Sequence, residues 1–229
     1  MSDTLAPLAL VRLLHLASPT LPVGAFSYSQ GLEWQVDCGA IRTERDAGEW
    51  ILALLDAGIA RFELPLLAAL MQAWTTADLD ALRALNDDYL ASREAAELRA
   101  ETVQMGYSCV QLLKALDACR DAAGVLAGID QPAFPTAWSG AAVALGVPVA
   151  PALAAWTWAW AENQVMAALK AVPLGQTAGQ RLLMTLGDAI PSRVATATTL
   201  ARADWSNFSP GLAIASCRHE TQYSRLFRS

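Results

Sequence analysis

Histidine and basic side chains are scarce in this 229-residue chain, and their scarcity excludes several kinds of chemistry. His15 and His219 are its two histidines, so acid–base or metal chemistry that depends on imidazole has few groups to use. Lys and Arg total 16 against 22 for Asp and Glu, a formal net charge of −6. Nucleic-acid binding needs a dense basic face that neutralises phosphates. We therefore expect no nucleic-acid partner.

Cysteine is also sparse, and no C-x-x-C pair occurs among the four, which are Cys38, Cys109, Cys119 and Cys217. The N-terminus has no basic segment followed by a clean apolar run and a small-residue cleavage site, as a secretory signal would have. These two observations predict unpaired thiols in a reducing compartment, and hence a cytoplasmic location.

Nucleotide-binding motifs are missing, since neither G-x-x-x-x-G-K-[ST] nor G-x-G-x-x-G occurs. One short run, Cys217-Arg218-His219-Glu220, contains ligand types that nickel or zinc accept. Adjacent positions of a helix point in different directions, so at most two of these side chains converge. We expect no cofactor and no metal site.

Charge is missing altogether between Asp130 and Glu162, and residues 141–161 are apolar except for one threonine. That length is sufficient for a membrane span. However, Pro148 and Pro151 interrupt the run, and both flanks are acidic without a Lys/Arg bias. We predict a buried helix pair around 136–146 and 150–171 and no membrane contact, and keep a lipid-facing segment as the alternative.

Leucine and alanine dominate a composition that is 54% hydrophobic. Both residues favour helices, and apolar positions recur at spacings of three and four with no alternating strand pattern. The sequence predicts an all-α, single-domain bundle of roughly ten helices that spans residues 1–229, with a tail at 207–229.

Two helical faces illustrate the pattern. In the first helix, around residues 5–17, the apolar face is expected to comprise Leu10, Leu13, Leu14 and Ala17. A longer seam predicts a helix packed along another helix; its members are Leu98, Thr102, Met105, Cys109, Leu112, Leu116 and Cys119. The charged residues beside this seam are expected on a solvated outer face; they are Arg93, Glu94, Glu97, Arg99 and Glu101.

The segment from Ser18 to Glu33 is too irregular for a plain helix or strand, with two prolines and two glycines among hydroxyl and aromatic side chains. One interpretation is a serine nucleophile at Ser27 or Ser29, which would make the protein a small helical hydrolase and requires His219 beside this loop. The other is structural: the serines cap a helix start, while Phe26 and Tyr28 fill the core. The polar ends of Tyr28, Gln30 and Glu33 need partners, so we expect these three residues at a binding surface.

The C-terminal segment is locally basic in an acidic protein, with Arg218, Arg225 and Arg228 against Glu220 alone. Its apolar residues come where a chain normally frays. Either the tail folds back on its own domain, or it orders when it docks on a partner. Arginines and aromatics are common anchors of such contacts. The candidate partner-binding residues of the tail are Arg218, His219, Glu220, Tyr223, Arg225 and Phe227.

Two segments carry a resemblance to a known family. Residues 18–33 resemble the signature of the UreF family of urease accessory proteins, and residues 219–229 resemble that family's C-terminal tail. One departure is Ala25, which stands where the family usually has a second glycine; we expect a negative φ there.

The resemblance implies an all-helical homodimer that is not an enzyme. Such a protein would bridge the UreD/UreH-type accessory protein and the UreG-type GTPase and support nickel insertion into apo-urease. The tail from about Pro210 would order against the UreD-type partner. Lys170, which precedes Pro173-Leu174-Gly175, resembles the family's basic position near the GTPase-facing surface.

Overall fold

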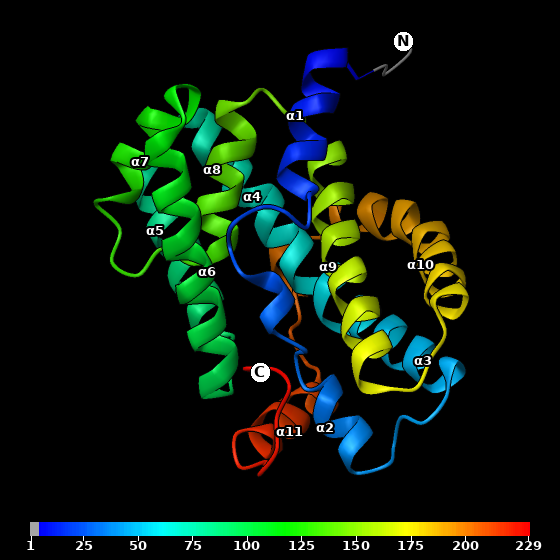
Figure 1. Ribbon diagram of the computed structural model, residues 1–229. Helices are drawn as coiled ribbons and strands as arrows, with labels where there is room; N and C mark the ends of the chain where they lie inside the picture. The colour runs from blue at the N-terminus through cyan, green and yellow to red at the C-terminus, as the bar shows by residue number, and fades with distance from the viewer. Residues whose placement is uncertain (1–4) are drawn as a thin grey trace.

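Helices make up the regular structure of residues 5–229, the part of the chain that the computed structural model describes (Figure 1). The α-helices are α1 (Pro7–Ala17), α2 (Leu32–Asp37), α3 (Glu44–Leu54), α4 (Leu64–Thr76), α5 (Leu79–Ala91), α6 (Ala96–Ala115), α7 (Arg120–Leu126), α8 (Phe134–Ala144), α9 (Val149–Ala171), α10 (Gln176–Ala197) and α11 (Pro210–His219). Short 3₁₀ turns are η1 (Ala25–Ser27), η3 (Asp117–Cys119) and η4 (Arg202–Asp204), and η2 (Leu55–Glu63) is a π-helix. Residues 5–229 contain no strand, so the all-α prediction is confirmed.

Helix α9 lies at the centre of the bundle and contacts α1, α2, α3, α4 and α10 (Figure 1). Its small buried residues Ala152, Ala161 and Ala168 let these neighbours approach closely. The predicted helix pair is confirmed as α8 and α9. No helix among residues 5–229 is both long and apolar enough to cross a membrane.

Helices α3 and α4 are joined without a loop by the π-helix η2. The N-terminus of α3 is fixed by a capping box, in which Thr43 accepts from the Asp46 amide and Asp46 accepts from the Thr43 amide. The π-helix ends just before Pro65, which has no amide hydrogen to donate. Its wider turn carries Glu63 inward, where this side chain is 8% exposed.

The predicted apolar face of the first helix is wrong in part. In α1 the buried residues are Leu13 and Leu16, whereas Leu10 and Leu14 are 45% and 62% exposed. The helix contacts α8 and α9 along one narrow side, where the Trp138 indole donates to the Leu16 carbonyl at 3.2 Å. A spacing pattern alone does not show which of two adjacent leucine rows meets the core.

All four thiols are free, as predicted, and both Cys109 and Cys119 are buried. Burial raises the pKa of the Cys109 thiol to about 12. The seam that contains these residues is shorter than predicted, because α6 ends at Ala115 and Cys119 lies in the following 3₁₀ turn.

Helix α6 crosses the start of α8 at Gly106, and this contact yields a stability prediction. A Cβ atom on Gly106 would lie 1.9 Å from the Pro132 carbonyl oxygen. We expect Gly106→Ala to reduce the free energy of unfolding by about 1–3 kcal/mol, since the backbone must move to relieve the overlap. Chemical denaturation followed by circular dichroism measures this change.

Gly124 in α7 provides the matched control, because a Cβ atom there meets no heavy atom within 4 Å. Alanine is the better helix former, so Gly124→Ala should be neutral or stabilising by up to about 1 kcal/mol. Equal effects of the two substitutions would show that the close approach at Gly106 is not a constraint.

Candidate functional site

The irregular segment after α1 and the C-terminal tail meet in the structure. The amides of Ser29 and Gln30 and the Ser29 hydroxyl donate to the backbone oxygen of Ser229, at 2.6, 3.2 and 2.6 Å. The Arg228 amide donates to the Ser27 carbonyl at 2.8 Å. Figure 1 shows the tail beside the lower end of α6, with α11 next to α2. Of the two interpretations of the tail, the structure displays the folded-back one.

Backbone conformation at the end of the segment makes this meeting possible. Gln30 and Gly31 have φ values of 52° and 78°, a left-handed pair that turns the chain into α2. A Cβ atom on Gly31 would lie 2.8 Å from the Ala215 side chain, so the glycine also permits α2 to approach α11. Ala25 begins the 3₁₀ turn with a negative φ, as predicted.

Glu33 holds the tail from the first turn of α2. Its carboxylate accepts from the amides of Leu226 and Phe227 at 2.6 and 3.0 Å, and its Oε2 lies 3.1 Å from His219 Nε2. The side chain is 6% exposed. One carboxylate therefore contacts two backbone donors of the tail and a ring nitrogen. We call the residues Glu33, Glu97, His219 and Arg225 the tail clasp.

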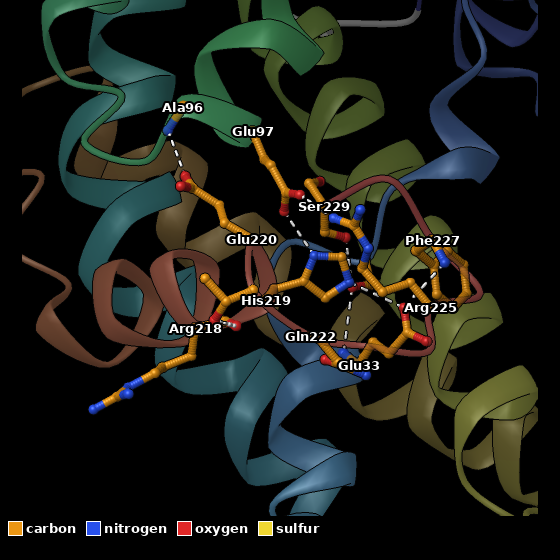
Figure 2. A network of polar contacts seen from close by, with 12 residues as sticks. Glu33, Ala96, Glu97, Arg218, His219, Glu220, Gln222, Arg225, Phe227 and Ser229 are labelled. Carbon is orange, nitrogen blue, oxygen red and sulfur yellow. Dashed lines mark hydrogen bonds and ion pairs between the residues drawn. The ribbon is translucent and has the colours of Figure 1, made fainter.

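His219 lies at the centre of the tail clasp and is fully buried (Figure 2). Its Nδ1 lies 2.6 Å from Glu97 Oε2, and Arg225 Nη1 lies 2.6 Å from the other oxygen of Glu97. A carboxylate therefore lies at hydrogen-bonding distance from each ring nitrogen of His219, and Arg225 brings a guanidinium to the same carboxylate of Glu97.

A second layer of contacts lies beneath the tail clasp, around Glu101. This carboxylate accepts from Gln30 Nε2 at 2.7 Å and from the Ser229 hydroxyl at 2.8 Å. Gln30 Oε1 in turn accepts from the Trp160 indole at 2.9 Å. Burial raises the pKa of Glu101 to about 7, although the two hydrogen bonds and the positive charge of Arg93 act in the opposite direction.

A buried ion pair completes the charged interior. Arg93 Nη1 lies 2.9 Å from Glu63 Oε1, with side chains only 7% and 11% exposed, and the Tyr89 hydroxyl donates to the same oxygen at 3.3 Å. The guanidinium also covers the Tyr89 ring at 4.4 Å from its centroid. Burial raises the pKa of the Tyr89 hydroxyl above its ordinary range.

These contacts overturn the prediction of a solvated charged face. Glu94 and Arg99 are exposed as expected, but Arg93, Glu97 and Glu101 point inward. The tail covers one side of α6, and Glu97 and Glu101, which are four residues apart, share that side. A face that looks polar in the sequence is therefore buried by a segment more than one hundred residues away.

A cavity of about 210 Å³ lies between the irregular segment, α6, α8 and α9. Three aromatic rings form one wall: the ring centroids of Phe134 and Trp138 lie 5.0 and 5.2 Å from that of Trp156, the first pair tilted and the second edge-to-face. Gln30, Glu63, Arg93 and Glu101 form its polar end. Sequence reasoning missed this cavity, because its lining comes from segments that are far apart in the sequence.

The structure gathers most of the predicted partner-binding residues around the tail. Tyr28, Glu33, His219 and Phe227 are buried, and Gln30 is half-buried. Tyr28 lies in the core as the structural interpretation of the loop expected, and its carbonyl accepts from Asn163.

The remaining predicted residues lie at the surface. Glu220 accepts from the Ala96 amide at 2.8 Å and so caps α6, and Arg225 belongs to the tail clasp (Figure 2). Lys170 is exposed, with its Nζ 5.4 Å from the Phe227 ring centroid. Arg218 and Tyr223 are exposed to solvent.

Sequence reasoning missed Glu97, Glu101 and Ser229 as parts of this site. The one signal available was the four-residue spacing of the two glutamates. It carried no information on what would cover them.

The geometry does not assemble the serine–histidine pair that a hydrolase at this loop would need. The Ser29 hydroxyl donates to Ser229 and accepts from the Glu33 amide, while both nitrogens of His219 contact carboxylates. The expected burial of Phe26 is wrong, since its side chain is 66% exposed at the mouth of the cavity.

The short run considered as metal ligands is also separated in space. Cys217 is exposed, His219 is engaged by the tail clasp, and Glu220 caps α6. Among residues 5–229, no three His, Cys, Asp or Glu side chains are placed to hold one ion.

Comparison with known proteins gives consistent results. The family profile described as UreF matches residues 41–187, which is more than half of the chain. The protein named urease accessory protein UreF of Azoarcus sp. (strain BH72) is 61% identical over 225 residues, which cover 97% of this chain and 96% of that protein.

Two further relatives carry the same name. The protein of Dechloromonas aromatica (strain RCB) is 58% identical to this chain, and the match covers 97% of this chain and 98% of that protein. That of Methylobacillus flagellatus is 47% identical over 96% of this chain and 98% of its own length. All three similarities cover at least 96% of this chain.

Proposed function

This chain belongs to the UreF family, and from that premise we propose that it is a non-catalytic maturation factor for urease. In this proposal it acts in the cytoplasm as a homodimer. It bridges the UreD/UreH-type accessory protein and the UreG-type GTPase and supports nickel insertion into apo-urease. The observation that carries the proposal is a tail whose inner face is fixed by the tail clasp while its outer face stays open.

The outer face of the tail is the proposed contact for the UreD-type partner. Tyr223 is fully exposed, Leu226 is 72% exposed, and Arg218 and Arg228 are exposed beside them. Exposed aromatic and arginine side chains are frequent anchors of protein interfaces. Because the backbone beneath them is already held, binding requires little further ordering of the tail.

The buried residues have a different role in this proposal. Glu33, His219 and Phe227 position the tail without touching the partner, because each is inaccessible in the folded chain. Of the residues expected at the partner surface, the exposed ones are therefore the proposed contacts, and the buried ones are positioning residues.

Lys170 is the proposed contact for the GTPase side. It is exposed near the C-terminus of α9, where a cation is favoured by the helix dipole. Its ammonium group lies over the inner aromatic residue of the tail, Phe227. This contact links the proposed GTPase contact to a positioning residue of the tail.

The partner contact is tested by replacing Tyr223 and Leu226 together with alanine. We expect affinity for the UreD-type protein to fall about 30-fold or more, since exposed anchors of this kind contribute about 2 kcal/mol or more. Binding is measured by calorimetry or pull-down with the purified partner, and urease activation is measured in parallel. Turnover of any substrate by the isolated chain would argue against a non-catalytic role.

Met184→Ala is the matched control, because Met184 is a 68% exposed apolar residue on α10, away from the tail. This variant should bind the partner normally. If the Tyr223/Leu226 variant also binds normally, the outer face of the tail is not the contact.

A further inference from the structure

The cavity between the irregular segment and α9 has walls of a kind that suits a small organic molecule. Its volume is about 210 Å³, and Leu98, Met105, Phe134, Trp138 and Trp156 line its apolar part. An apolar cavity of about 150 Å³ is known to admit benzene. This cavity is therefore large enough for one ring with a short arm, and too small for a peptide helix.

The polar end of the cavity carries an excess of negative charge. Glu63 is paired with Arg93 at 2.9 Å. Glu101 has no such partner of its own and receives two neutral donors, Gln30 Nε2 and the Ser229 hydroxyl. A carboxylate offers about four acceptor positions, so about two remain on Glu101. Glu162 also lines the cavity, and burial raises its pKa.

The cations nearby do not remove this excess. Arg93 is engaged by Glu63 and by the Tyr89 ring. Lys170 lines the cavity, but its Nζ lies over the Phe227 ring. The incomplete compensation is consistent with the raised pKa of Glu101, for which burial is the largest cause.

We propose that this cavity is a binding site for a small organic monoamine, with one ring-sized apolar body and one primary ammonium group that donates to Glu101. The ammonium has three donors for the free acceptor positions of the carboxylate. The clustered rings of Phe134, Trp138 and Trp156 receive the apolar body, and aromatic faces also attract cations. This site goes beyond the proposed maturation role, because it requires no protein partner.

Occupancy of the cavity is coupled to the tail through Glu101. The carboxylate that would bind the ammonium also accepts from the Ser229 hydroxyl. A bound cation stabilises the ionised form of Glu101, which is the form that accepts from Ser229 most strongly. The ligand therefore strengthens closure of the tail.

The test compares three probes of nearly equal size: phenethylamine, phenethyl alcohol and hydrocinnamate. The full chain is titrated at about pH 8, where the amine is cationic, and binding is followed by tryptophan fluorescence and calorimetry. The amine should bind about tenfold or more tighter than the alcohol, because the hydrogen bond to a charged group is the stronger one. The carboxylate probe should not bind.

Two substitutions separate this site from unspecific binding. Glu101→Gln should reduce the amine affinity about tenfold or more and leave the alcohol affinity unchanged, while the exposed Glu94→Gln should change neither. Ala159 lines the cavity, so Ala159→Phe should abolish binding of both probes by filling it.

Three results would overturn the proposal: equal affinities for amine and alcohol, no binding of the amine, or undiminished amine binding in Ala159→Phe. If Glu101→Gln fails to fold, the probe series and Ala159→Phe still decide the question.

Discussion

Glu33→Ala is expected to release residues 220–229 from the body of the protein while the helical bundle stays folded. The substitution removes the acceptor for the Leu226 and Phe227 amides and one of the two carboxylates that hold His219. Hydrogen bonds to a charged group contribute about 1.5–3 kcal/mol each. Even without full additivity, we expect local closure of the tail to weaken by about 3 kcal/mol or more.

Hydrogen exchange measures this loss residue by residue. A loss of about 3 kcal/mol corresponds to an acceleration of exchange of roughly 100-fold. It should appear at Leu226 and Phe227 and at the amides of Ser29 and Gln30, which bond to Ser229. Affinity for the UreD-type partner should fall as well, although no exposed residue of the tail has changed.

Glu49→Ala is the control for the Glu33 substitution. Glu49 is a glutamate on the surface of α3, and its contact is a one-turn pair with the exposed Arg45. We expect no change in tail exchange in this variant. Unchanged exchange at Leu226 and Phe227 in Glu33→Ala would mean that the tail is held by its apolar contacts, chiefly Phe227, and not by the tail clasp.

The second large effect is expected at the ion pair of Arg93 and Glu63. Arg93→Met leaves the Glu63 carboxylate buried beside Tyr89 without its cation. Removing one partner of a buried pair costs about 3–5 kcal/mol. We expect the free energy of unfolding to fall by that amount in chemical denaturation, with the all-α circular dichroism spectrum retained.

A double substitution distinguishes loss of the pair from loss of packing. When Glu63→Leu is combined with Arg93→Met, no unpaired charge remains, and most of the lost stability should return. Arg45→Met, which removes a solvent-exposed pair, should leave stability unchanged. If Arg93→Met behaves like that surface control, water reaches the Glu63 carboxylate and the pair is not a structural requirement.

Local rules were sufficient to predict the helices. Composition and three-four spacing predicted the all-α class, and the turn between α8 and α9 was found from Pro148 and the uncharged run around it. These features depend on neighbours within a few residues, so a single sequence contains them.

The site could be predicted only in part. Glu33 was selected because its polar end needs a partner, and His219 because it belongs to the C-terminal tail, but nothing showed that they are partners of each other, 186 residues apart. Glu97 and Glu101 were placed on the solvated side of α6, because the segment that covers them is distant in the chain. Local periodicity carries no information about which distant segment covers a helix face.

Residues 27–33 are hydrogen-bonded to residues 226–229. During synthesis these bonds can form only after the tail has been made. A ribosome adds about 5–20 residues per second. Ser229 follows Ser29 by 200 residues, so it is added roughly 10–40 s later. Until then Glu33, Glu97 and Glu101 remain hydrated and the loop has no cover. The nascent chain therefore exposes three ionised carboxylates where the finished protein has a closed interior, and so unfinished and finished chains differ at one surface.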